Sequence, residues 1–291
     1  MIFASLEQAR VALLCDAVRL ASTSGESFAV IGGWSPFLLN STPLKHPGTA
    51  DVDLLFAEGV TAGRLKHAFE LFLAEGYHPS AKHPFQLIQI MQVGVEELAF
   101  NVDILHPNEQ ARRDLFADHI ELPVPMTPFM QQNLKMKSIA VPASRFIFKY
   151  NRTAIVSVKQ TNASGQEIGT PVPLIDEAGL IVTKSYSFRN PKRNRDFFDI
   201  YLAIKQCRDR SEVTAFLRKL KKEEPETFNT LHAIEHTITR NPSLLTIPNE
   251  YLPTSLREPP DAVRACVIEF LREAGVEPGG NAEYKENLIV E

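Results

Sequence analysis

Apolar residues recur with two different periods along the first 120 residues, and each period predicts one kind of element. Spacings of three and four residues over 5–22 and 61–76 are typical of amphipathic helices. In the second of these helices, Thr61 suits the N-cap position and Gly76 suits the stop. Short apolar runs predict strands over 28–32, 51–56, 85–93 and 98–105. This succession predicts an α/β (α+β) fold for the first part of the chain.

The second half of the chain changes character after a stretch rich in proline and turn residues. In that stretch the runs RFIFKYN (145–151) and AIVSVKQ (154–160) predict short strands. The pattern then becomes mostly helical, and the predicted helices are 176–189, 192–208, 211–223, 225–240 and 260–274. The residues after the last helix predict a loose end. We therefore expect two domains, a core over 1–135 and a mostly helical domain over 136–291 that starts with a short β segment.

Composition narrows the class of protein. With 44% hydrophobic and 23% charged residues among 291, the chain is typical of a soluble globular protein. It contains no run of eighteen apolar residues, and its first twenty residues make a poor signal peptide, so we expect no membrane association. Three widely spaced cysteines argue against a zinc ribbon or a disulfide framework and favour the reducing cytoplasm. The net charge of −4 means that any contact with nucleic acid must be local.

Three aspartates stand in apolar strands and are the first candidates for chemistry. Asp51 and Asp53 alternate with Val52, so their side chains should share one face of a strand, about 7 Å apart. Asp103 lies in a second apolar strand, and if the two strands pair, three carboxylates could converge on one or two divalent cations such as Mg²⁺. The alternative is a solvated strand edge.

A glycine pair precedes these aspartates. Gly32 and Gly33 have no Cβ, so a phosphate could approach their N–H groups closely. Ser35 falls where a helix would begin and could add a hydroxyl donor at the positive helix end. The alternative is a plain strand-to-helix turn capped by Ser35, with Trp34 as a packing residue.

These segments together resemble a known pattern. GGWS, then TADVDLLF, then NVDIL resembles the motif order of the nucleotidyltransferase superfamily of the DNA polymerase β type. The gap from Ser35 to Asp51 is long for that motif, and we interpret STPLKHPG as a small loop insertion. The segment VTKSYSFRNPKRNRDFFDIYLAI (182–204) resembles the Lys…Arg…Arg-Asp-x-x-Asp signature of the AbiEii and MenT-like nucleotidyltransferases, many of which are toxins of toxin–antitoxin or phage-defence systems.

The resemblance implies a nucleotidyltransferase core with a mixed β-sheet and a role for each matching residue. Phosphate contacts of the nucleotide are implied for Gly32, Gly33, Ser35, Lys184 and Arg195. Mg²⁺ would be bound by Asp51 and Asp53, with Asp103 as a third carboxylate. Lys184 would contact the triphosphate, and Asp196 falls on the later acidic position of the family. Asp199 lies four residues after Arg195 and could orient it.

The implied reaction is Mg²⁺-dependent transfer of a nucleoside monophosphate from an NTP to an acceptor hydroxyl. In MenT-like relatives the acceptor is the tRNA 3′ end, and a cognate antitoxin protein would be a partner. The segment 184–195 holds five basic residues with Tyr186 and Phe188 among them, so it could contact RNA or be a solvated helix face. Two other functions stay open: transfer to a small molecule or a protein side chain, and a non-catalytic nucleotide-binding module of the same fold.

Overall fold

In a computed structural model, the chain forms two compact units, and each is described by itself. The structure describes residues 2–39, 44, 46–107, 114–118, 120, 135–161 and 166–277. The sheet unit comprises residues 1–41 and 46–179, and the helical unit comprises residues 42–45 and 180–291. The predicted division at residue 135 falls inside the sheet unit, because the strands that follow residue 135 pair into the same sheet as those before it.

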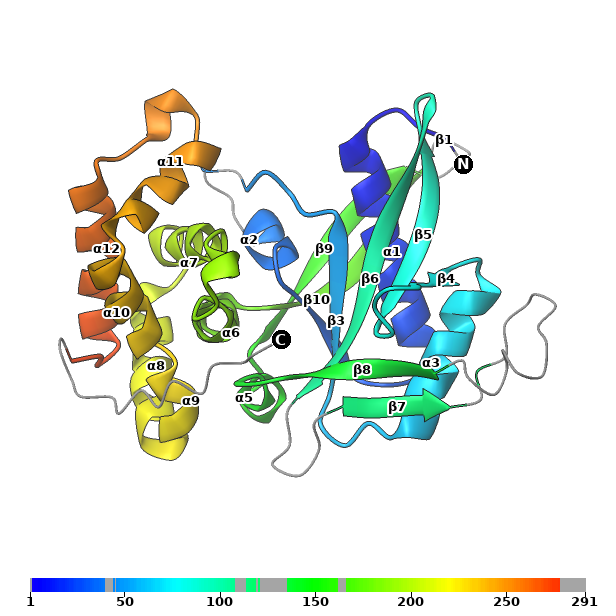
Figure 1. The fold of residues 1–291 in the computed structure, drawn as a ribbon, viewed down its shortest axis with the longest axis horizontal. Coiled ribbons are helices and arrows are strands. Elements are labelled where there is room, and N and C mark those ends of the chain that lie inside the picture. The colour runs from blue at the N-terminus through cyan, green and yellow to red at the C-terminus, as the bar shows by residue number, and fades with distance from the viewer. Residues whose placement is uncertain are drawn as a thin grey trace. The chain divides into compact units, whose positions relative to one another are not determined.

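The sheet unit is built on a mixed sheet of ten strands within the described residues (Figure 1). The strands are β1 (Ile2–Phe3), β2 (Phe28–Ile31), β3 (Asp51–Phe56), β4 (His78–Pro79), β5 (Gln86–Val93), β6 (Glu96–Pro107), β7 (Asp114–Asp118), β8 (Lys135–Val141), β9 (Thr153–Thr161) and β10 (Glu167–Ile175). The main path runs β1-β5-β6-β3-β2-β10-β9. β3 pairs with β6 in parallel and with β2 antiparallel, so the predicted mixed sheet is confirmed.

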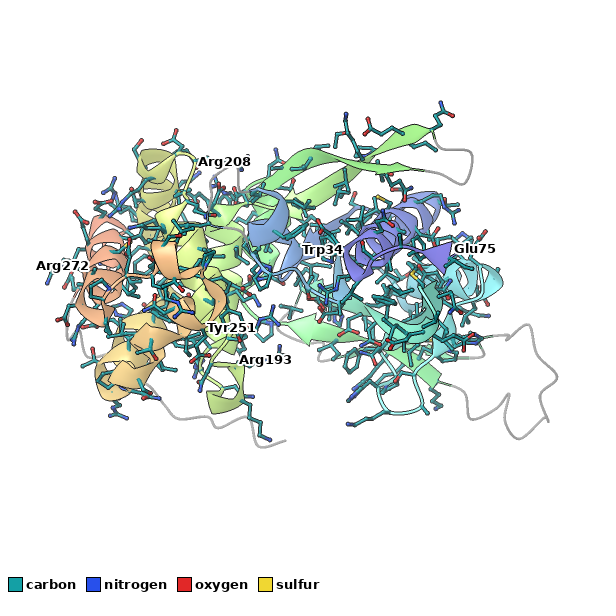
Figure 2. All side chains as sticks on the ribbon, turned by 90° about the horizontal axis from the view of Figure 1, so that it is seen from above. Trp34, Glu75, Arg193, Arg208, Tyr251 and Arg272 are labelled. Atoms are coloured by element: carbon teal, nitrogen blue, oxygen red, sulfur yellow. The ribbon has the colours of Figure 1, made fainter. Side chains whose placement is uncertain are left out.

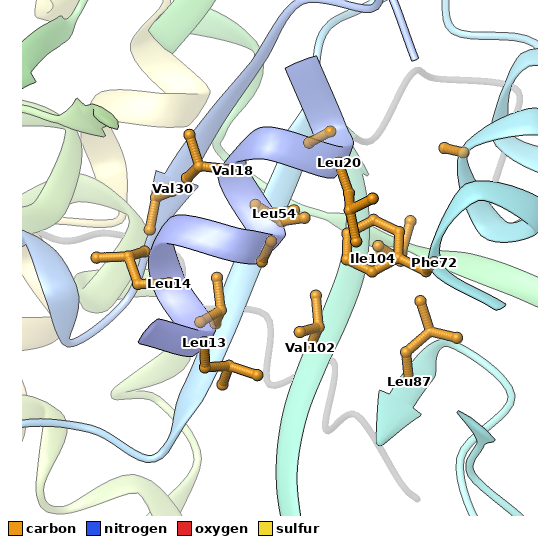
Figure 3. Packing of buried hydrophobic residues seen from close by; sticks show 14 of the residues in the cluster. Leu13, Leu14, Val18, Leu20, Val30, Leu54, Phe72, Leu87, Val102 and Ile104 are labelled. Carbon is orange, nitrogen blue, oxygen red and sulfur yellow. The ribbon is translucent and has the colours of Figure 1, made fainter. Parts of the chain in front are cut away.

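Two helices bury one face of this sheet. The helices of the unit are α1 (Leu6–Thr23), α2 (Trp34–Leu38), α3 (Ala62–Ala74) and α5 (Arg145–Lys149). Helix α3 begins as predicted, because the Thr61 hydroxyl accepts a hydrogen bond from the amide of Arg64. Apolar side chains of α1 and α3 pack against those of β3, β5 and β6, as Figure 3 shows for Leu13, Leu54 and Val102. Burial of these side chains fixes which face of each strand looks away from the core.

Two parts of this unit differ from the sequence prediction. Residues 145–151, predicted as a strand, contain helix α5, which follows Ser144 and ends before Asn151, a residue with φ of 52°. A short apolar run cannot be assigned to strand or helix by periodicity alone, and here Phe146 and Ile147 are buried on a helical turn. Strands β1, β4, β7, β8 and β10 were not predicted. Strand β8 pairs with β6, which is distant in the sequence, whereas β10 pairs mainly with the neighbouring β9 but contains Pro171 and Pro173, which disfavour a strand prediction.

The helical unit is mostly α-helical, as predicted. Its elements are α6 (Glu177–Ser187), which begins at the end of the sheet unit, η1 (Pro191–Arg193), α7 (Asp196–Lys205), α8 (Arg210–Glu223), α9 (Pro225–Asn229), α10 (His232–Arg240), η2 (Pro242–Thr246), α11 (Ile247–Tyr251), η3 (Thr254–Leu256) and α12 (Pro260–Glu273). The single helix predicted over 225–240 is divided, because the amides of Thr230 and Leu231 bond to carbonyls three residues back. The helix predicted over 192–208 begins later, at Asp196.

Two further expectations concern the C-terminal end and membrane-spanning helices. The loose end predicted after residue 274 lies mostly outside the described residues, which stop at 277. In the described part of the chain, no helix combines the length and apolar character that crossing a membrane requires.

Candidate functional site

A row of polar side chains crosses the middle of the sheet on the face opposite to the apolar core. Asp53 on β3 lies directly across from Asp103 on β6, and Asp103 lies across from Gln86 on β5. Asp51, two residues before Asp53, lies across from Asn101. These side chains are half-buried, whereas Val52, between the two aspartates, is fully buried. The two aspartate-bearing strands therefore do pair, which was the condition for the three carboxylates to come together, and the three carboxylates lie on adjacent strands of one face.

Neutral donors orient two of these carboxylates. The side-chain amide Nε2 of Gln86 donates to Oδ1 of Asp103 over 2.9 Å. The hydroxyl of Thr49 donates to Oδ1 of Asp51. The indole Nε1 of Trp34 donates to the backbone carbonyl of Asp51 over 2.8 Å, so Trp34 does more than pack at the turn. An uncharged donor fixes the direction of a carboxylate and leaves its negative charge in place.

Gln86 and Thr49 were missed from the sequence, although a signal for each exists. Gln86 follows from the register of the β5–β6 hairpin around Gly94, which sets Gln86 opposite Asp103. Thr49 stands two residues before Asp51, a spacing at which a hydroxyl can reach a neighbouring carboxylate.

The glycine turn lies directly against the carboxylates. Gly32 has φ of +77°, a conformation that L side chains rarely adopt. The carboxylate Oδ2 of Asp53 fills the space that a Cβ on Gly32 would need. Glycine at this position is therefore required both by the backbone conformation and by the close approach of Asp53.

Gly33 and Ser35, the groups of the turn that were expected to bind phosphate, differ in their accessibility, because Ser35 is fully buried. Gly33 caps α2, whose five residues make it too short for a large helix dipole, so the expected phosphate contacts at this turn would depend on individual N–H groups. Ser35 is fully buried, and its Oγ has no hydrogen-bond partner among the residues that the structure describes. A buried hydroxyl without a partner is costly, so it is a group that a ligand oxygen could complete.

The donor set of this face suits a hard divalent cation. Carboxylate oxygens are the protein ligands of Mg²⁺, which usually takes one or two of them and completes its shell with water and substrate phosphates. Asp51 and Asp53 supply such a pair beside the glycine turn. Within the described residues, no group of three or more His, Cys, Asp or Glu side chains is arranged to hold a metal ion, so the three aspartates do not form such a group. Asp103 as a third ligand remains a prediction.

The second predicted cluster belongs to the helical unit and is a buried charge triad. The ammonium of Lys184 on α6 lies 2.7 Å from Oδ1 of Asp196 and 2.7 Å from Oδ2 of Asp199, both on the first turn of α7. Ser187 donates a further hydrogen bond to Oδ2 of Asp196. We expected Asp199 to orient Arg195. In the structure its carboxylate forms an ion pair with Lys184. The triad joins α6 to α7, and a contact of Lys184 with a triphosphate remains a prediction.

The charge of Lys184 is secured by its two partners. Burial alone would lower the pKa of this ammonium, but the charges of Asp199 and Asp196 outweigh it and raise the pKa above its ordinary value. Because the folded-state pKa is the higher one, the stabilisation is complete below the ordinary value of 10.5 and is lost only as the pH rises through the folded-state value.

Arg195 is exposed on the helical unit, unlike the buried triad of Lys184, Asp196 and Asp199. Its guanidinium lies over the ring of Tyr251 at 5.5 Å from the ring centroid, and that ring stacks on Phe198 at 4.8 Å. Both Tyr251 and Arg193 belong to the helical unit, whereas Trp34 belongs to the sheet unit (Figure 2). Arg195 and Tyr251 also line a mainly polar cavity of about 310 Å³.

Comparison with known proteins gives limited likeness. No protein-family model matches the chain, and no curated protein matches it. An antigenic nucleotidyltransferase-like protein from Paracoccidioides brasiliensis is 14% identical, with 79% of this chain and 94% of that chain covered and a TM-score of 0.33. The antibiotic-resistance factor ANT(2'')-Ia is 15% identical, with 80% and 94% covered and a TM-score of 0.32. TM-scores this low do not establish a shared fold.

Replacement of Gly32 by alanine tests the link between the turn and the sheet. The new Cβ would require a left-handed conformation and would displace the carboxylate of Asp53. We expect the free energy of unfolding to fall by about 1–2 kcal/mol or more, measured by urea denaturation. Gly63→Ala on α3 is the matched control, because a Cβ there meets open space. Equal stability of the two variants would contradict the close contact.

Replacement of Lys184 by methionine tests the buried triad. The change leaves Asp196 and Asp199 buried without their ammonium partner, so we expect the free energy of unfolding to fall by about 3–5 kcal/mol at pH 7. Lys219→Met, at an exposed pair with Glu223 3.9 Å away, should change it by less than about 0.5 kcal/mol. A small loss at Lys184 in urea denaturation would show that the triad contributes little to stability.

Proposed function

We propose that this protein is a metal-dependent nucleotidyltransferase that moves a nucleoside monophosphate from an NTP to an acceptor hydroxyl and releases pyrophosphate. One observation carries the proposal. Asp51, Asp53 and Asp103 lie on one face of adjacent strands, and the carboxylate of Asp53 lies against the Gly32 turn. A short apolar Asp-x-Asp strand could be an isolated surface feature, but here it is joined both to a third carboxylate and to a glycine turn.

Each residue has a chemical role in this proposal. Asp51 and Asp53 would hold Mg²⁺, which when bound offsets the charge of the phosphates and of the departing pyrophosphate. Gly33 and Ser35 would donate hydrogen bonds to phosphate oxygens. Asp103, held in direction by Gln86, is the proposed third carboxylate. In the transfer, the acceptor oxygen bonds to the α-phosphorus, the bond from that phosphorus to pyrophosphate breaks, and the hydroxyl proton passes to a base, for which the row offers Asp103.

A basic strip on the helical unit supports RNA as the acceptor. Between the end of α6 and the start of α7 the exposed residues include Arg189, Lys192, Arg193 and Arg195. The guanidinium of Arg189 also lies over the ring of Tyr186, 5.5 Å from its centroid. Cations interleaved with rings suit a single-stranded nucleic acid, whose phosphates and bases bind such groups. A tRNA 3′ end, a toxin role, a cognate antitoxin and a cytoplasmic location are parts of the same proposal.

The proposal is tested by measuring transfer of a radioactive nucleotide from an NTP to an acceptor. The purified protein is incubated with Mg²⁺, each α-³²P-labelled NTP and total tRNA, and the products are separated on gels. We expect label on RNA. Label on the protein itself would instead indicate protein modification, and label on an added aminoglycoside would indicate a small-molecule acceptor. A protein that transfers label to nothing, and whose NTP binding is unaffected by Asp51→Ala, would be a module without this activity.

Replacement of Asp53 by asparagine tests the carboxylate row. Asn keeps the shape but removes a charge that the cation needs, so we expect the transfer rate to fall about 100-fold or more, since even outer-shell partners of metal ligands cost 10- to 100-fold. Asp261→Asn, an exposed change on α12, is the matched control and should leave the rate unchanged. Equal rates in the two variants would exclude Asp53 from the chemistry.

A further inference from the structure

A short segment of the sheet unit, residues 46–49, lies across the glycine turn, and we call it the strap. Thr49 and His46 fill the space beside the backbone of Gly33: an ideal Cβ on Gly33 would lie 3.0 Å from Cβ of Thr49 and 3.3 Å from Cε1 of His46. This is the side from which a phosphate would have to approach Gly33 if it used the room that the missing side chain leaves.

The strap also contacts the carboxylate row. The hydroxyl of Thr49 donates to Oδ1 of Asp51, which is an oxygen that the proposed cation would use. A hydrogen bond to an ionised carboxylate is among the stronger ones, so it holds the strap in place. One residue of the strap therefore contacts both halves of the proposed site, the turn and the metal-binding aspartate.

The strap has a defined conformation of its own. Gly48 has φ of +87°, and its amide donates to Nδ1 of His46 over 3.0 Å. Its Cα lies beside α1 and α2, because an ideal Cβ on Gly48 would lie 3.2 Å from Nη1 of Arg10 and 4.0 Å from Cε2 of Phe37. His46 is almost fully buried, at 3% exposure. These contacts show a folded cover rather than a loop that merely passes the turn.

The hydroxyl of Ser35 is not accessible to a ligand in this conformation. Ser35, two residues after Gly33, has no exposed surface, and in the described part of the chain its Oγ has no hydrogen-bond partner. A phosphate can therefore reach Ser35 only after something moves. Among the described residues, the strap packs against the turn, and it does so through the side chains of Thr49 and His46.

We propose that the strap is a gate that closes the phosphate side of the site and must lift to admit the triphosphate of an NTP. This inference rests on the proposed function. The closed state lowers the apparent affinity for the nucleotide by the fraction of molecules that are open. Weakening the contact between Thr49 and Asp51 should therefore strengthen nucleotide binding, which is the opposite of what loss of a direct binding residue would do.

The chain carries its own reporter for this movement. Trp34 is the only tryptophan, it is 2% exposed, and its indole is bonded to Asp51 beside the strap. Quenching of its fluorescence by acrylamide, and hydrogen exchange of the amides over 32–37, measure opening without any nucleotide. Binding of Mg²⁺-NTP is measured separately by calorimetry.

The test uses two variants that loosen the strap at different points. Thr49→Ala removes the hydroxyl bonded to Asp51, and Gly48→Ala adds a Cβ close to Arg10 in a conformation that disfavours it. We expect both to increase quenching and exchange, and Thr49→Ala to lower the Kd for NTP about fivefold, the effect of losing one hydrogen bond. Thr23→Ala, an exposed threonine at the end of α1, should change neither measurement.

The outcomes separate the gate from the proposed function. Unchanged quenching and exchange in both variants, with folded proteins by circular dichroism, would overturn the gate. Weaker NTP binding by Thr49→Ala would also overturn it and make Thr49 a binding residue. Faster exchange in the variants together with no NTP binding by any of the proteins would overturn the proposed function, and the gate with it, while showing that the cover itself is movable. Thr49→Val, which keeps the shape without the hydroxyl, assigns the effect to the bond with Asp51.

Discussion

The parallel pairing of β3 with β6 is the constraint on which the candidate site depends. In this register Asp53 lies opposite Asp103 and Val52 lies opposite Val102. A shift by one residue would turn Val52 and Leu54 away from the core and bury the carboxylates instead. The apolar face packed against α1 and α3 therefore holds three acidic groups together on the other face, although like charges on neighbouring strands repel one another. The stability of the core is what maintains this concentration of charge.

The carboxylates of the two units differ in their burial and in their hydrogen-bond partners. In the helical unit, Asp196 and Asp199 are buried and share the ammonium of Lys184, so the charges are largely settled within the fold. In the sheet unit, Asp51 is half-buried and bonded to the neutral hydroxyl of Thr49. A buried triad with matched partners is suited to joining helices, whereas half-buried carboxylates with neutral donors retain the negative charge that the proposed cation would need.

The sequence allowed prediction of those features that depend on neighbours along the chain. The alternation of Asp51, Val52 and Asp53 predicted the two faces of β3, and Thr61 predicted the start of α3. The pairing of β10 with β2 through Leu174 and Val30 was not predicted, because local patterns do not encode a contact between residues so far apart in the sequence. The helix at 145–149 was predicted as a strand because its run of Phe and Ile residues suits both elements.

The candidate site shows the same division. Gly32 and the three aspartates could be recognised because their residue types and order are distinctive, and the close approach of Asp53 to Gly32 gives a physical reason for that order. The segment STPLKHPG was interpreted as an insertion, yet its end contributes His46 and Gly48 to the cover of the turn. Loop residues of this kind have no periodicity, so their contacts can be found only once the turn and the strand are placed in space.

In the proposed mechanism, the position of Thr49 would link metal binding to the movement of the strap. Its hydroxyl donates to the same carboxylate of Asp51 that a divalent cation would need, and a donor hydrogen and a cation compete for the lone pairs of one oxygen. A cation that binds better when Thr49 is withdrawn must, by linkage, favour the open strap by the same factor. While residues 46–49 lie in place, they occupy Asp51 and the space beside the backbone of Gly33. Binding of the cation together with the phosphates would therefore favour the open strap. Residues 46–49 would thus belong to the proposed site, since they would set when the carboxylates and the turn can act on one ligand.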